Sequence, residues 1–173
     1  PKAELFVNGK SQGIREKNDS SHMTRYRLMW NDVVYEPGEV RVVSYDALGN
    51  PTGHAVIHTA GEPHHIVLSA NRQSLVADGE DLAYVTVQIA DQEGNIVPTD
   101  TRTVRFTVDG AGKFRAAANG DPTSLRLFHL PETDLFSGAA TAIVQAGERN
   151  GRLTLTVTAD GVAPASITIP VTK

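Results

Sequence analysis

The feature that most constrains this fold is a two-residue alternation of apolar and polar side chains, which recurs in short runs along the chain. It is clearest over residues 83–89, 104–108, 153–158 and 167–171. Successive side chains of a β-strand point to opposite faces of the sheet, so this period predicts strands with one buried face. No stretch is long enough, with a period of 3.6, to predict a helix. The sequence therefore predicts an all-β fold.

Residues 59–63, Thr-Ala-Gly-Glu-Pro, separate two groups of strand-like runs. Gly61 frees the backbone, and Pro63 fixes φ and lacks an amide donor, so no sheet ladder should continue through this segment. We predict two β-sandwich modules of the immunoglobulin-like kind in tandem, residues 1–62 and residues 63–173. The first is small. Its sequence enters a strand at once without an initiator Met, which favours a fragment of a longer protein with a truncated first module.

Turn signals punctuate both modules. Asn8-Gly9 lies between strand-like runs and predicts a hairpin, because both residues tolerate positive φ. Residues 25–30 alternate and predict a further strand in the first module. Residues 46–50 and 91–95 share the spacing Asp-x-x-Gly-Asn and predict the same turn. The second module has about seven short strands rich in Val and Thr, which is typical of an immunoglobulin-like sandwich.

Composition excludes several function classes. The net charge is −4 and the pI is near 5.8, so there is no basic footprint for nucleic acid or for an anionic membrane surface. No apolar run approaches the roughly 20 residues that span a bilayer. The chain has no cysteine, which excludes disulfides and thiolate metal sites. We therefore predict neither a nucleic-acid partner nor a membrane partner.

The residue types that could carry chemistry do not form a convincing catalytic, cofactor or metal site. His54 and His58 would share a strand face but lie about 13 Å apart, too far to ligate one ion. The glycine-rich residues 110–113 lack the first Gly and the final Ser or Thr of a phosphate-binding loop. Glu36 and Glu39 flank a Pro-Gly turn with nothing apolar to raise a pKa. We predict no catalytic residue, no cofactor and no metal.

Trp30 is the only tryptophan of the chain. A flat indole on an exposed sheet face can stack on a sugar ring, which would make Trp30 a carbohydrate contact. Its spacing from Tyr26 and Leu28 places all three on one strand face, which favours burial in the core of the small module. Burial is the preferred interpretation, and sugar stacking is the alternative.

The most specific motif is residues 119–124. It consists of Asn119, Gly120, Asp121, Pro122, Thr123 and Ser124. Asn and Gly accept left-handed dihedral angles, and the Asp121 carboxylate can accept amide hydrogen bonds from the two residues after the proline, which predicts a structured turn. The alternative is a docking loop that contacts the rest of a larger enzyme. Residues 125–131 favour docking, because they are apolar but do not alternate as a strand does.

These motifs carry a family resemblance that spans nearly the whole chain. The first module resembles the module after the catalytic barrel in bacterial glycoside hydrolase family 2 beta-galactosidases, through residues 4–13, 26–30 and 35–40. The second resembles the immunoglobulin-like C-terminal domain of the same enzymes, through residues 59–63, 75–79, 119–124 and 151–161. The resemblance implies an exo-acting parent enzyme, periplasmic or secreted, with a sugar-binding domain and a (β/α)₈ barrel upstream.

The resemblance also implies a function for the chain itself. The catalytic glutamates of the family lie on the barrel, which needs about 250 residues and none of whose motifs is present here. We therefore expect no enzyme activity from this chain alone. The expected role is to brace the catalytic barrel or to mediate domain or homo-oligomer contacts, with the upstream domains of the same polypeptide as partners. The alternative is an independent carbohydrate-binding or adhesive module.

Overall fold

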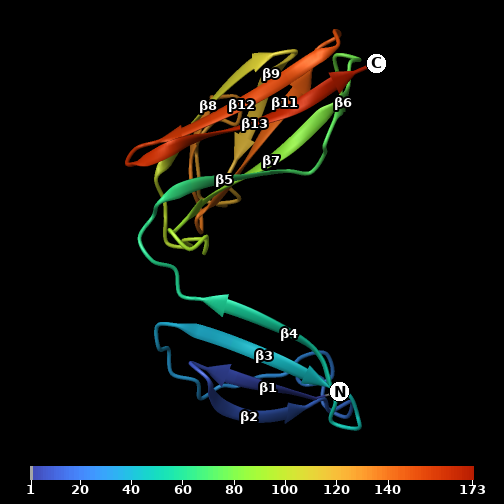
Figure 1. Cartoon of the computed structure of the whole chain (residues 1–173), viewed down its shortest axis with the longest axis vertical. Coiled ribbons are helices and arrows are strands. Elements are labelled where there is room, and N and C mark those ends of the chain that lie inside the picture. Colours follow the sequence, from blue (N-terminus) through green and yellow to red (C-terminus); the bar gives the residue numbers. More distant parts are fainter. Residues whose placement is uncertain (1) are drawn as a thin grey trace. The chain divides into compact units, whose positions relative to one another are not determined.

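A computed structural model describes residues 2–173, which form thirteen strands and no helix (Figure 1). The all-β class predicted from the alternation is confirmed. The chain folds into two compact units, one ending at Thr59 and the other spanning Ala60–Lys173. Among the described residues, no helix exists that could cross a membrane.

The first unit contains a single antiparallel sheet in the order β2-β1-β3-β4. Its strands are β1 (Lys2–Val7), β2 (Lys10–Glu16), β3 (Glu39–Tyr45) and β4 (Pro51–His58). The predicted hairpin is confirmed, since β1 and β2 pair around Asn8 and Gly9, whose φ values are 48° and 78°. One sheet stands where a small sandwich was expected.

The strand predicted over residues 25–30 is wrong, because that segment has no regular structure. Alternation indicates which face a side chain would take, but a strand forms only where its backbone pairs with a neighbour. The edge strands β2 and β4 each have a free side, yet residues 25–30 pair with neither. The Arg25 amide instead bonds to the Ser21 carbonyl at 2.9 Å, and its guanidinium donates to the Asp19 carbonyl at 2.7 Å. Tyr26 is 85% exposed, so it does not share a buried face with Trp30.

The second unit is a β-sandwich made from one continuous strand order, β10-β8-β12-β13-β5-β7-β11-β9, with β6 paired to β13. The two sheets of the sandwich join at a parallel pairing of β5 with β13. The strands on either side of this pairing cover one core (Figure 1). The strands are β5 (His65–Ala70), β6 (Leu75–Val76), β7 (Leu82–Ala90), β8 (Thr103–Gly110), β9 (Gly112–Ala118), β10 (Glu132–Asp134), β11 (Ala139–Ala146), β12 (Gly151–Ala159) and β13 (Val162–Thr172).

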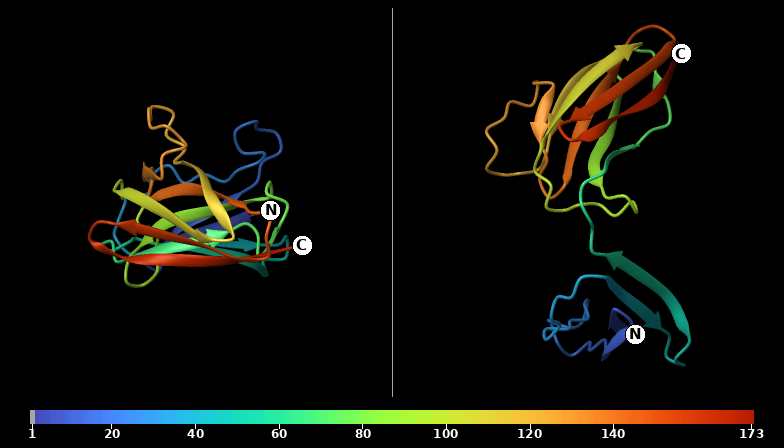
Figure 2. Two further views of the ribbon diagram at one scale, coloured as in Figure 1. Left: turned by 90° about the horizontal axis from the view of Figure 1, so that it is seen from above. Right: turned by 60° about the vertical axis from the view of Figure 1, so that its left-hand side comes forward.

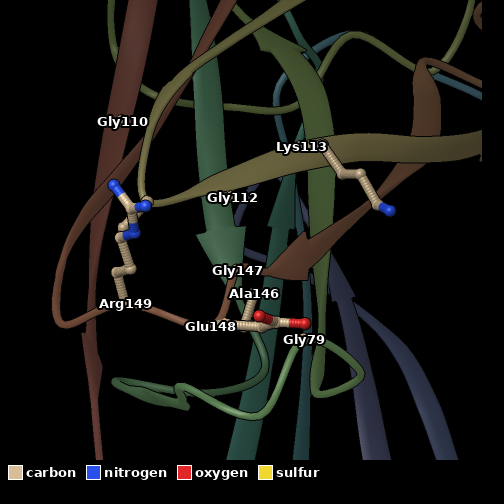
Figure 3. A pocket seen from close by; sticks show the side chains of 9 residues that line it. Gly79, Gly110, Gly112, Lys113, Ala146, Gly147, Glu148 and Arg149 are labelled. Carbon is tan, nitrogen blue, oxygen red and sulfur yellow. The ribbon is translucent and has the colours of Figure 1, made fainter.

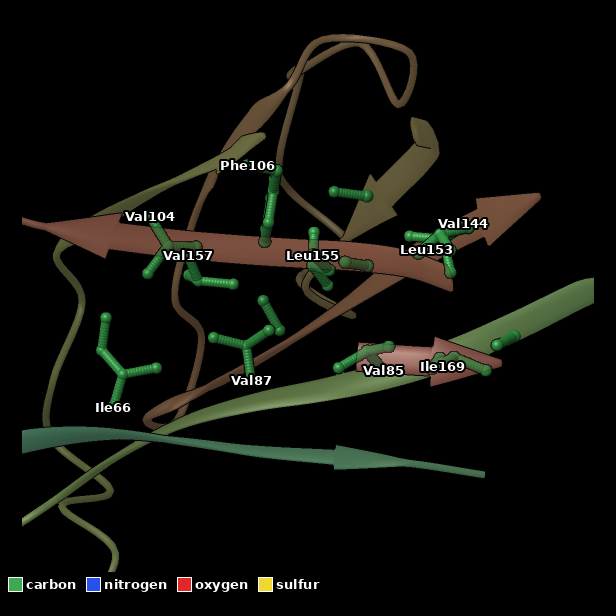
Figure 4. Close-up of a cluster of buried hydrophobic side chains, with 14 of the residues drawn as sticks. Ile66, Val85, Val87, Val104, Phe106, Val144, Leu153, Leu155, Val157 and Ile169 are labelled. Carbon is green, nitrogen blue, oxygen red and sulfur yellow. The ribbon is translucent and has the colours of Figure 1, made fainter. Parts of the chain in front are cut away.

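The apolar side chains of the alternating sequence runs form the core of the second unit. Val85 and Val87 on β7, and Leu153 and Leu155 on β12, are fully buried between the sheets (Figure 4). The residues between them are more exposed. Burying each such side chain stabilises the fold by about 1.5–3 kcal/mol. Among the described residues of the first unit, Ala3 and Val7 are the only buried apolar residues. The second unit therefore has the larger apolar core.

The two Asp-x-x-Gly-Asn turns have the same geometry, as predicted. In each turn the aspartate accepts the asparagine amide at 2.8 Å on Oδ1 and the asparagine side-chain nitrogen at 3.0 Å on Oδ2, for Asp46 with Asn50 and for Asp91 with Asn95. The turn glycines have φ values of 90° and 89°. One local sequence therefore gives one local structure in both units.

Asp91 has a further contact that Asp46 lacks. Its Oδ2 atom accepts the amide of Gly61, in the segment between β4 and β5, at 2.7 Å. Asp91 is 1% exposed, whereas Asp46 is only partly buried. The Gly61 amide, and after it the Asn95 side chain, lower the pKa of Asp91 to about 2. The charged carboxylate thus fixes the start of the second unit to the turn at residues 91–95.

Asp91→Asn is expected to lower the melting temperature of the second unit by several degrees at pH 7. The two carboxylate oxygens accept the amides of Gly61 and Asn95, whereas an asparagine side chain has one acceptor oxygen and an NH₂ group that cannot accept the other bond. The native pKa lies below the ordinary value of 3.8, so the stabilisation is complete above pH 3.8 and is lost as the pH falls towards 2. The gap between wild type and variant should therefore shrink between pH 4 and pH 2. Thermal unfolding followed by circular dichroism measures it.

The matched control is Asp46→Asn, which alters the same turn where no Gly61 contact exists. It should leave the second unit's melting temperature unchanged at every pH. A second unit that melts alike with and without the Asp91 carboxylate would contradict this role of the Gly61 contact.

Candidate functional site

The motif at residues 119–124 directly follows β9 and is a turn held by its own side chains. Asn119 Oδ1 accepts the amide of Asp121 at 3.0 Å. Asp121 Oδ1 accepts the amide of Thr123 at 2.8 Å and its hydroxyl at 2.7 Å. Gly120 has a φ of 79°. These are the bonds that the structured-turn interpretation requires, and they leave the docking hypothesis to be judged on the residues that follow.

An ionic cluster anchors the loop that continues from this turn. Arg126 donates to both carboxylate oxygens of Asp134 on β10, at 2.9 and 3.0 Å, and to Glu132 at 2.7 Å. The hydroxyl of Thr103 on β8, and after it Arg126, hold the pKa of Asp134 below its usual range. The two carboxylates in turn raise the pKa of Arg126. The loop is therefore fastened to the edge of the sandwich by charged hydrogen bonds, which are stronger than neutral ones.

The same loop exposes an unusual amount of apolar surface. Leu125 is 95% exposed, Leu127 59% and Phe128 68%. We refer to these three residues as the apolar segment. Its backbone is ordered by hydrogen bonds, since the Phe128 carbonyl accepts the Ala117 amide of β9 at 2.7 Å. In both views of Figure 2 this gold-to-orange loop projects from the sandwich. Single exposed apolar residues are ordinary, but a cluster on a fixed projecting loop is typical of an interaction surface.

An open hollow of about 590 Å³ lies beneath this loop, lined by residues that include Asn119, Asp121, Ser124, Arg126 and Phe136. Most of its polar groups already have partners within the loop or on β10. The hollow therefore offers few free donors or acceptors to orient a small ligand. The exposed apolar segment beside it is the better candidate for a binding surface.

A second hollow, of about 440 Å³, lies at the glycine-rich turn between β8 and β9 (Figure 3). A Cβ on Gly112 would lie 2.5 Å from the backbone carbonyl oxygen of Gln145, so the close pairing of β9 with β11 requires this glycine. Lys113 and Arg149 lie on opposite sides of the hollow and do not converge on one point (Figure 3). The residues at 110–113 are a turn between strands, as predicted, and the geometry does not support a phosphate site.

The remaining candidates lie in the first unit. Trp30 is half-buried, and its Nε1 atom donates to the Gly13 carbonyl at 2.9 Å, which uses the polar edge of the indole within the unit. His54 and His58 lie exposed on β4. Within residues 2–173, no group of three or more His, Asp or Glu side chains is placed to hold a metal ion.

Several aspartates have shifted pKa values, and every shift is downwards. Backbone amides of Glu80 and Asp81 lower the pKa of Asp78, and the Asn50 side chain and amide lower that of Asp46, in the same direction as Asp91 and Asp134. A general acid needs a raised pKa, which burial without hydrogen-bond donors supplies. These carboxylates are instead held as anions in turns and ion pairs. The sequence did not predict the Arg126 cluster, because nothing in local spacing pairs it with Glu132 and Asp134.

The fold and this site together define an all-β region whose distinctive features are fixed turns and an exposed apolar surface. Residues 66–168 match the model of the glycoside hydrolase family 2 C-terminal domain 5, and residues 1–53 match a domain of unknown function, DUF4982. The chain therefore belongs to glycoside hydrolase family 2, as part of its C-terminal region.

Individual relatives agree with this assignment. The chain is 38% identical over 167 residues to beta-galactosidase BoGH2A of Bacteroides ovatus, covering 96% of this chain and 19% of that protein. It is 25% identical over 171 residues to a beta-glucuronidase of Formosa agariphila, covering 96% of this chain and 16% of that protein. The crystal structure of a glycosyl hydrolase family 2 member from Bacteroides cellulosilyticus superposes with a TM-score of 0.90 at 32% identity, covering 99% of this chain and 22% of that one. The chain thus spans about a fifth of the length of these relatives.

Proposed function

We propose that this chain is a non-catalytic C-terminal accessory region of a family 2 glycoside hydrolase, a beta-galactosidase. It braces the catalytic barrel or mediates domain or subunit contacts in that parent enzyme. The observation that carries the proposal is the apolar segment, Leu125, Leu127 and Phe128, presented on a loop that Arg126 fastens to β10. A rigid loop with exposed apolar side chains suits contact with another protein surface. Residues 1–62 and 63–173 are proposed as its two domains.

The charged side chains support a structural role. The aspartates with shifted pKa values cap turns or pair with arginine, so their charges stabilise this region and are not poised to transfer a proton. The carbohydrate-binding alternative draws less support, because Trp30 is half-buried and its Nε1 atom is bonded within the first unit. Export of the parent to the periplasm or beyond belongs to the same proposal and rests on the family resemblance.

The test is turnover of chromogenic β-galactoside and β-glucuronide substrates by the isolated 173-residue chain and by the full-length parent. Both proteins are produced in a host that lacks its own enzymes for these substrates. The full-length parent should hydrolyse the galactoside, and the isolated chain should hydrolyse neither substrate. Turnover by the isolated chain that persists through purification would contradict a non-catalytic role, and hydrolysis of only the glucuronide by the parent would correct its substrate.

A further inference from the structure

The loop that carries the apolar segment is held in one conformation by contacts within the second unit. The Arg126 ion pairs fix one side of the loop, and the Ala117–Phe128 and Leu130–Leu127 backbone hydrogen bonds, at 2.7 and 3.2 Å, fix the chain that carries the apolar side chains. A preformed loop loses little conformational entropy on docking, which favours affinity. The same ion pairs neutralise Arg126, so the guanidinium would enter an interface already paired.

We propose that Leu125, Leu127 and Phe128 insert into an apolar surface on another domain of the same polypeptide. This inference rests on the proposed function, because it takes the chain to be one region of a longer glycoside hydrolase. The partner's expected chemistry follows from the segment: a concave patch of aliphatic and aromatic side chains that excludes water around two leucines and a phenylalanine.

The size of the segment distinguishes this occupant from a second copy of the chain. Three side chains with these exposures offer on the order of 400 Å² of apolar surface. A stable interface between separate chains buries about 800 Å² on each partner, so the segment alone is too small to hold a second copy. A partner on the same polypeptide faces an effective concentration of about millimolar or more, at which a small contact is sufficient. The relatives, of which this chain covers 19% and 22%, have room for such domains.

The test replaces Phe128 with the photo-crosslinking residue p-benzoylphenylalanine in the full-length parent. The replacement keeps the backbone carbonyl that binds the Ala117 amide and changes a side chain that is 68% exposed, so the fold should be retained. Irradiation should join position 128 to a peptide outside residues 1–173, identified by mass spectrometry, within a single polypeptide. The double substitution Leu125→Ser and Leu127→Ser should reduce that crosslink by about tenfold, since it removes apolar contact on both sides of the reporter.

The matched control carries the same crosslinker at Leu48, which is 88% exposed on the turn at residues 46–50 and has no exposed large apolar neighbour beside it in sequence. It should give no comparable product, and an equal crosslink there would show that exposure alone explains the result. A crosslinked dimer on a denaturing gel, or no crosslink from position 128, would overturn the proposal. With either of these two results, an inactive isolated chain would still agree with the proposed accessory role. Turnover by the isolated chain would instead overturn the accessory role itself.

Discussion

Leu155→Ala is expected to reduce the free energy of unfolding of the second unit by about 3 kcal/mol, in the range measured for truncating buried leucines. Leu155 is fully buried on β12, between Val108 of β8 and Ile167 of β13 in the sheet register. Truncation removes apolar contacts and leaves a cavity that neighbouring strands cannot close, because both are held in register by backbone hydrogen bonds. Urea unfolding followed by circular dichroism measures the loss.

Leu125→Ala is the matched control, because the chemical change is the same and the environment is opposite. Leu125 is 95% exposed, so truncation in the isolated chain should change the free energy of unfolding by no more than about 0.5 kcal/mol. Equal losses for the two variants would mean that the core does not lie where the structure places it. The pair therefore separates residues that hold the fold from residues available for contact.

Gly138→Ala is expected to destabilise the second unit by on the order of 3 kcal/mol or more, through two combined effects. Gly138 has a φ of 72°, which side-chain-bearing residues avoid, and an added Cβ would lie 2.2 Å from the carbonyl oxygen of Val97. That oxygen belongs to the backbone and cannot rotate away. The Gly138 amide also donates to the Asp100 carbonyl at 3.2 Å, so moving the turn would weaken that bond.

Gly120→Ala isolates the first of these effects. Gly120 has a φ of 79°, but a Cβ there would meet nothing within 4 Å. The expected loss is about 1 kcal/mol, from backbone strain alone. Thermal unfolding of both variants should show a clearly larger shift for Gly138→Ala. Similar shifts for the two glycines would refute the steric contribution from Val97.

Local sequence predicted local structure well in this chain. The alternation at residues 83–89 fixed which side chains of β7 face the core, because strand geometry leaves only two faces to choose between. Asn8-Gly9 and the two Asp-x-x-Gly-Asn turns have the expected conformations, since their residue types determine φ. The all-β class follows from these elements together.

Pairing between distant segments was not predictable from the same signals. Residues 25–30 alternate like a strand but pair with neither edge strand of the sheet, so the first unit has a single sheet where a sandwich was expected. Asp46 and Asp91 each begin the same turn motif, yet only Asp91 also binds Gly61. Gly61 lies thirty positions away in the sequence, so the motif itself does not predict this contact. The domain boundary expected after Glu62 stays a prediction.

The candidate site shows the same division between local and distant contacts. The turn at residues 119–124 could be predicted, because Asn119 and Asp121 bond to residues two positions ahead. The cluster of Arg126 with Glu132 and Asp134 could not, since it depends on how the loop returns to β10. That cluster turns an apolar stretch without strand alternation into a fixed surface.

We propose that this region acts through contact between the apolar segment and another domain of a larger polypeptide. Hydrogen exchange of backbone amides over residues 125–130, measured in the isolated chain and in the full-length parent, tests it most directly. We expect exchange to be slower by about tenfold or more in the parent, because burial excludes water, and unchanged over residues 46–50, which serve as the internal reference. Equal exchange rates over residues 125–130 in the two proteins would contradict it.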